Sequence, residues 1–222
     1  MRTQTKDIQT HLTPEKALDI LVEGNRRFVS NLRVNRNLLQ QVNETSSGQF
    51  PFAIVLSCID SRTSAELIFD QGLGDIFSAR VAGNVVNEDV LGSMEFACQV
   101  AGSKLIVVLG HSKCGAVKGA CDHVHLGHLT GLLNKISPAV HEVERGGGAE
   151  LPHAEFVEKV ALENTRQQMR AILERSPILE HLFKEGKIGI VGAMYSVESG
   201  EVAFFEQAFQ TPAPAAVMAA TR

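Results

Sequence analysis

Short, continuous runs of apolar residues alternate along the chain with longer stretches in which apolar residues recur at helical spacing. The strongest runs are Phe52–Ser57 and Lys104–Leu109, and such runs are typical of strands buried on both faces of a sheet. A weaker run at 76–81 and a third buried run at 188–193 predict two more strands. Helices are expected between the strands, near residues 63–70, 88–101 and 154–175.

This alternation predicts an α/β fold with a central, mostly parallel sheet flanked by helices. The segment Glu201–Phe205 follows a Ser199-Gly200 turn, so it is expected to pair antiparallel with the strand before it. We therefore predict about four parallel strands and one antiparallel edge strand.

We divide the chain into an N-terminal tail at residues 1–13, one domain at 14–206 and a C-terminal tail at 207–222. The domain begins with a helical arm at 14–50. Its amphipathic helix starts at Pro14, with Thr13 as the N-cap, and runs to about Ser30. Residues 31–50 are polar, and we expect them to be irregular.

The composition is that of an ordinary globular protein: of 222 residues, 44% are hydrophobic and 21% are charged. A net charge of −4 gives no indication of binding to nucleic acid or to an acidic membrane. The polar first residues do not form a secretory signal, and no apolar run is long enough to cross a bilayer, so we expect a cytoplasmic protein. Its four cysteines are then free, metal-bound or catalytic.

Candidate metal ligands follow both of the strongest strands. Cys58 comes directly after the first, and His111 and Cys114 come after the second. Because the carboxyl ends of parallel strands meet at one edge of a sheet, these residues are expected to lie together. Two thiolates and an imidazole are ligands that suit zinc, and three protein ligands leave a fourth position open for water.

Asp60 and Arg62 lie beside the first ligand. An aspartate in this place can bind the metal or accept a hydrogen bond from its water, and the arginine can hold the carboxylate in its ionised form. The alternative is an ordinary ion pair at the start of the next helix.

These motifs resemble those of the β-carbonic anhydrases. The segments Cys58–Arg62 and His111–Gly115 are similar to the two signatures of that family, and Arg80–Asn84, Gly92–Ala97 and Gly192–Val202 are similar to further family segments. The resemblance covers most of residues 14–206. It implies one zinc ion per chain bound by Cys58, His111 and Cys114, with Asp60 and Arg62 as the catalytic dyad.

The resemblance also implies a substrate cleft. Gln49 matches a glutamine that reaches the substrate of the neighbouring subunit, Phe77 and Ala82 match apolar cleft residues, and Phe96 stands where plant-type members have a tyrosine. A homodimer or homotetramer is therefore expected, and the amphipathic N-terminal helix is expected to need an apolar partner surface. Val100 replaces a histidine proposed as a proton shuttle in those members.

The predicted function is the reversible hydration of carbon dioxide to bicarbonate and a proton, by attack of a hydroxide that zinc generates. Two alternatives keep the same site. One is a hydrolase of carbon disulfide or carbonyl sulfide, and the other is a non-catalytic zinc-binding module. We predict an open site in which Asp60 is paired with Arg62, because Val55 replaces the tryptophan of a regulatory bicarbonate pocket that Arg80 and Tyr195 otherwise match.

Overall fold

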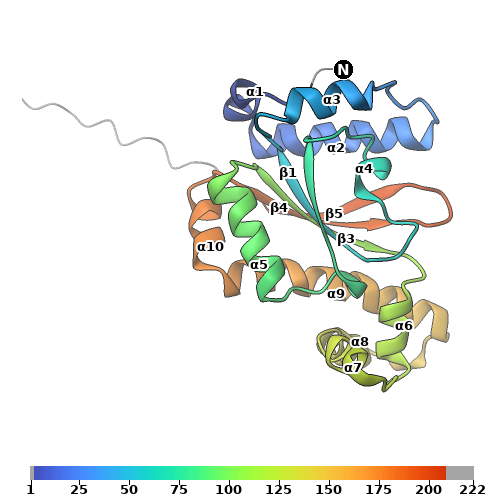
Figure 1. Ribbon diagram of the computed structural model, residues 1–222. Coiled ribbons are helices and arrows are strands. Elements are labelled where there is room, and N and C mark those ends of the chain that lie inside the picture. The colour runs from blue at the N-terminus through green and yellow to red at the C-terminus, as the bar shows by residue number, and fades with distance from the viewer. Residues whose placement is uncertain (1–2, 209–222) are drawn as a thin grey trace, which may run out of the picture.

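A computed structural model describes residues 3–208 (Figure 1). Its core is a five-stranded sheet in the order β2-β1-β3-β4-β5, in which every neighbouring pair is parallel except β4 and β5. The predicted fold class is therefore confirmed, including the antiparallel edge strand. The strands are β1 (Ala53–Ser57), β2 (Ile76–Arg80), β3 (Leu105–His111), β4 (Gly189–Tyr195) and β5 (Val202–Ala208).

Helices cover both faces of the sheet (Figure 1). On one face, apolar side chains of β1, β3 and β4 pack against α2 and α4; on the other, they pack against α5, α9 and α10. The helices are α1 (Lys6–His11), α2 (Pro14–Val29), α3 (Leu38–Thr45), α4 (Ala65–Ile68), α5 (Glu88–Glu95), α6 (Gly115–Cys121), α7 (Gly127–Leu133), α8 (Ser137–Arg145), α9 (His153–Arg175) and α10 (Pro177–Lys184). Three shorter helical segments are the 3-10 turns η1 (Ala82–Asn84) and η3 (Gly148–Glu150) and the π-helical η2 (Phe96–Val100).

Two N-terminal segments are more ordered than the sequence indicated. Within residues 1–13, α1 is capped by Thr5, and the buried Gln9 side chain donates hydrogen bonds to the carbonyls of Pro51 and Ala101. The prediction that 31–50 is irregular was wrong, because α3 forms there with Asn37 as its N-cap. The predicted C-terminal tail falls almost wholly at 209–222, outside the described residues.

The apolar face of α2 is covered by the sheet of its own chain. Ala17 and Leu21 are fully buried there, and Leu18 is nearly so. The expectation that this helix needs a partner surface was therefore wrong for α2 itself. In the described part of the chain, no helix is both long enough and apolar enough to cross a membrane.

Candidate metal centre

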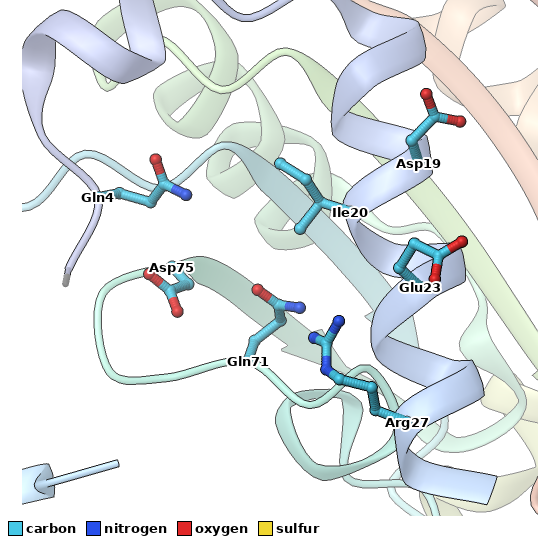
Figure 2. Close-up of a pocket in the computed structure, with 7 residues that line it drawn as sticks. All are labelled: Gln4, Asp19, Ile20, Glu23, Arg27, Gln71 and Asp75. Carbon is cyan, nitrogen blue, oxygen red and sulfur yellow. The ribbon is translucent and has the colours of Figure 1, made fainter. Parts of the chain in front are cut away.

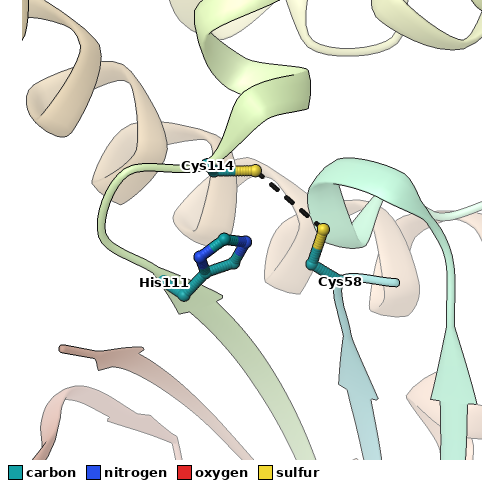
Figure 3. A group of neighbouring side chains, drawn as sticks. All are labelled: Cys58, His111 and Cys114. Carbon is teal, nitrogen blue, oxygen red and sulfur yellow. Dashed lines mark hydrogen bonds between the residues drawn. The ribbon is translucent and has the colours of Figure 1, made fainter. Parts of the chain in front are cut away.

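The strand register brings the three candidate ligands to the same edge of the sheet. Ser57, the last residue of β1, pairs with Leu109 of β3, so Cys58 follows directly and His111 ends the neighbouring strand. Cys114 lies beyond a turn in which Lys113 has a φ of 55°, and it is the N-cap residue of α6. Figure 3 shows the three side chains converging from these two strand ends.

The ligand atoms form a compact and buried group. All lie within 4.8 Å of one another, and the two sulfurs are 4.0 Å apart. Each residue is at most 4% exposed. The group therefore has the size and the seclusion of a site for one metal ion.

The imidazole of His111 is oriented for binding a cation. Its Nδ1 lies 2.9 Å from the carbonyl oxygen of Ser112, which only accepts, so Nδ1 carries the proton and Nε2 keeps its lone pair. That Nε2 atom is buried and has no hydrogen-bond partner in the protein. A buried acceptor without a partner costs about 1–3 kcal/mol, and a metal ion at this point removes the penalty.

A hydrogen bond joins the sulfurs of the two cysteines. A hydrogen bond from the Cys114 thiol, opposed by burial and aided by His111, lowers the pKa of Cys58 to about 4. The same hydrogen bond and burial raise the pKa of Cys114 far above its usual range. A cation between the sulfurs would favour loss of the Cys114 thiol proton as well. Two thiolates with one neutral imidazole are a ligand set that fits zinc.

Asp60 is held beside the group by Arg62. The arginine donates from Nε and Nη2 to the two carboxylate oxygens, at 2.9 and 2.8 Å, and its backbone N–H adds a third bond of 2.9 Å. These hydrogen bonds outweigh burial and hold the pKa of Asp60 well below its usual range. The carboxylate is therefore ionised, and it is paired with Arg62 in the arrangement that the sequence predicted for an open site.

Two further residues fix the loop that carries Asp60. Arg80 donates to the carbonyl oxygens of Cys58 and Asp60, at 3.0 and 2.6 Å, and the Thr63 hydroxyl lies 2.9 Å from both of the same oxygens. The sequence analysis gave neither residue this role. Arg80 stands at the end of β2 in a segment that resembles the family, which was the available signal; Thr63 had none beyond its proximity to Asp60.

The predicted cleft residues are divided between two places. Ala82 begins the turn η1, whose next residue, Gly83, donates its N–H to the sulfur of Cys58 at 3.3 Å. Phe77 lies near the start of β2, where its ring meets that of Phe96 at 6.2 Å, and the exposed Gln49 precedes β1. Phe77 pairs with Ile54 of β1, so it lies roughly 13 Å from Cys58 at 3.3 Å per residue, and Phe96 lies beside it. Within a single chain, only Ala82 is brought to the site.

A separate cavity of about 280 Å³ opens beside α2 (Figure 2). It is lined by Gln4, Asp19, Ile20, Glu23, Arg27, Gln71 and Asp75. None of these residues belongs to the metal group.

Together, the mostly parallel sheet and the Cys-His-Cys group at its carboxyl edge form a buried group of three residues that could hold a metal ion, beside a salt-bridged carboxylate. The carbonic anhydrase family matches residues 53–202. Carbonic anhydrase 2 of Mycobacterium tuberculosis is 36% identical over 195 residues, covering 84% of this chain and 90% of its own length. The carbonic anhydrase of Mycolicibacterium smegmatis is 33% identical over 196 residues, and the match covers 85% of this chain and 92% of the relative.

Among solved structures, the β-carbonic anhydrase CcaA superposes with a TM-score of 0.69 at 28% identity, covering 85% of this chain and 95% of its own. The chain belongs to the β-carbonic anhydrase family.

Proposed function

We propose that this protein is a zinc-dependent carbonic anhydrase that interconverts carbon dioxide and bicarbonate. The observation that carries the proposal is the buried Cys58, His111 and Cys114 group, in which an unpartnered Nε2 and two sulfurs face one point. When bound there, zinc supplies a Lewis acid that lowers the pKa of a coordinated water.

Asp60 and Arg62 carry out the remaining chemistry of the proposal. The carboxylate of Asp60 accepts a hydrogen bond from the attacking water and so orients it toward the substrate carbon. Arg62 keeps that carboxylate ionised and away from the metal ligands, since both of its oxygens are engaged by the guanidinium group. The proton released by hydration leaves to solvent or buffer.

We also propose that the substrate cleft is completed by a second copy of the chain. In this arrangement Ala82 comes from the chain that binds the metal, and Gln49, Phe77 and Phe96 come from its partner. Their position near the other end of β1 and β2 supports this division, because one chain does not bring them to its own metal group. In this proposal the assembly is a homodimer or a dimer of dimers. The cytoplasmic location of the protein stays a prediction.

The proposal is tested by replacing one ligand. In Cys114→Ser, a hydroxyl replaces the thiolate, so we expect bound zinc to fall far below one per chain after dialysis and carbon dioxide hydration to be lost with it. Cys121→Ser is the matched control, since Cys121 lies outside the metal group at the end of α6. Full zinc and full activity in Cys114→Ser would contradict the ligand assignment.

The same measurements on the unaltered protein separate the alternatives. Rapid hydration of carbon dioxide, followed by stopped-flow with a pH indicator, identifies a carbonic anhydrase. Turnover of carbon disulfide or carbonyl sulfide without carbon dioxide hydration identifies the hydrolase. Stoichiometric zinc with no turnover of any of the three identifies a non-catalytic module.

A further inference from the structure

The turn η1 reaches the metal group through a single backbone hydrogen bond. Gly83 N–H donates to the sulfur of Cys58 at 3.3 Å. Gly83 and Asn84 are both left-handed, with φ values of 68° and 45°. The positive φ favours glycine at this position, and a Cβ there would lie 2.6 Å from Cδ1 of the fully buried Ile136, which would have to shift. Successive left-handed residues are unfavourable, and such a turn needs support from its surroundings.

That support comes from two buried amides on α9. Asn164 is fully buried and Gln168 is 6% exposed. The Asn164 Nδ2 donates to the carbonyl oxygen of Gly83 at 2.9 Å, and Gln168 Oε1 accepts from Val86 N–H at 2.8 Å. Gln168 Nε2 then donates to Asn164 Oδ1 at 3.1 Å, which links the two side chains.

The backbone groups dictate the orientation of both amides. The oxygen of Gly83 can only accept, so Asn164 must present its NH₂ group, and Val86 N–H can only donate, so Gln168 must present its oxygen. The NH₂ group of Gln168 then faces the oxygen of Asn164, so a donor meets an acceptor. Burying two amides in an apolar core is unfavourable unless their groups are paired, and here every amide heavy atom has a partner.

We propose that Asn164 and Gln168 are positioning residues of the metal centre, which hold the turn at Gly83 so that its N–H stays on the sulfur of Cys58. The inference rests on the proposed function only in that the group binds zinc. Neither residue touches the ligands, and each acts through the backbone between Gly83 and Val86. Hydrogen bonds to a ligand from outside the coordination shell typically change metal affinity by 10–100-fold.

The test compares Asn164→Leu, an apolar side chain of similar size, with Ser176→Ala. Ser176 is also fully buried and polar, but it caps α10 and bonds to Glu95. Zinc affinity is measured by chelator competition, and exchange of the Gly83 amide hydrogen by ¹⁵N NMR, in both zinc-free and zinc-loaded protein. We expect Asn164→Leu to weaken zinc binding by about 10–100-fold and to speed Gly83 exchange at least ~10-fold relative to Ser176→Ala.

Gln168→Met is a second variant, which keeps the length of the side chain. If Asn164→Leu does not fold, zinc affinity and Gly83 exchange in Gln168→Met test the inference instead. Because the two amides are linked, Gln168→Met should cause little further loss of zinc affinity, and little further increase in Gly83 exchange, once Asn164 has been replaced. Equal zinc affinity and equal Gly83 exchange in the amide variants and Ser176→Ala would overturn the inference. Absence of zinc binding in the unaltered protein would instead overturn the proposed function, and Gly83 exchange in the zinc-free protein would still test the hydrogen bonds.

Discussion

At the scale of single residues, Asp70 and Asp75 are buried carboxylates whose environments shift their pKa values in opposite directions. Asp70 is 3% exposed and Asp75 is 6% exposed. Burial acts to raise the pKa of Asp70, but hydrogen bonds from Arg27 and Arg36 outweigh it and lower the pKa. Asp75 forms no ion pair with any residue that the structure describes, and burial raises its pKa although the N–H groups of Gly72 and Gln4 and the charge of Arg36 act to lower it. Figure 2 shows Asp75 and Arg27 at different parts of the same cavity.

We therefore expect Asp70→Asn and Asp75→Asn to have opposite effects on the free energy of unfolding at neutral pH. Asp70→Asn removes the carboxylate charge that Arg27 and Arg36 both bind and costs about 3 kcal/mol, the lower end for breaking a buried pair. Asp75→Asn removes an unfavourable buried charge and keeps an oxygen for Gly72 N–H, so it stabilises the protein. Urea unfolding at pH 7 measures both. Equal destabilisation by the two variants would contradict this account.

The pH dependence follows from the same shifts. The folded pKa of Asp70 lies below its unfolded value of about 3.9, so its stabilising contribution is complete above that pH and is lost as pH falls through the folded pKa. Asp70→Asn lacks this contribution at every pH. The stability difference between the two proteins should therefore shrink on acidification below about pH 4, as measured by urea unfolding at several pH values.

At the scale of elements, α2 is joined to its own chain by very close contacts. A Cβ on Gly24 would lie 1.8 Å from the carbonyl oxygen of Phe69. The next residue, Asn25, donates to the carbonyls of Ile68 and Gly200 and accepts from Val202 N–H. The helix is thereby linked both to the end of α4 and to the β4–β5 hairpin.

Gly24→Ala should accordingly destabilise the protein by 1–3 kcal/mol or more, on the order of other overpacking substitutions, because backbone rather than a flexible side chain obstructs the new methyl group. Gly131→Ala is the control: it lies in α7 with no atom within 4 Å of the added Cβ. There the helix propensity of alanine should stabilise by up to about 1 kcal/mol. Thermal unfolding of the two variants measures the contrast, and a stable Gly24→Ala would show that α2 does not pack this closely.

The elements that the sequence predicted well are those whose pattern is complete within a short window. The apolar runs of β1 and β3, and the capped, amphipathic α2, are of this kind. The six-residue α1 is too short to be stable alone, and its Gln9 is anchored by residues far along the chain.

The same distinction applies to the site. That Cys58, His111 and Cys114 lie together was predictable, because each stands at or just beyond the end of an apolar strand. Asn164 was not, because its significance comes from a bond to Gly83, which lies 81 residues away in the sequence. A buried amide on a helix has no local signature that distinguishes it from an exposed one.

At the scale of the whole molecule, α3 presents an apolar face to solvent. Leu38, Leu39 and Val42 lie at helical spacing and are 56%, 65% and 51% exposed. Such a cluster on a helix is typical of a surface that another protein covers. Gln49 follows this helix closely along the chain, so a second copy packed against α3 brings Gln49 toward the partner. This face, rather than that of α2, supports the proposed dimer.

Leu39→Glu should therefore convert the dimer to a monomer, because it introduces a charge into an apolar contact. Sedimentation velocity over a range of concentrations measures the change. Ile178→Glu is the control, since Ile178 is 43% exposed on α10 and lies outside this face. We expect the Leu39→Glu monomer to keep its zinc, because all three ligands come from one chain, and to lose most of its activity, because the partner's cleft residues are missing. An unaltered protein that is monomeric and fully active, or a Leu39→Glu variant that still sediments as a dimer, would contradict the shared cleft or its placement on α3.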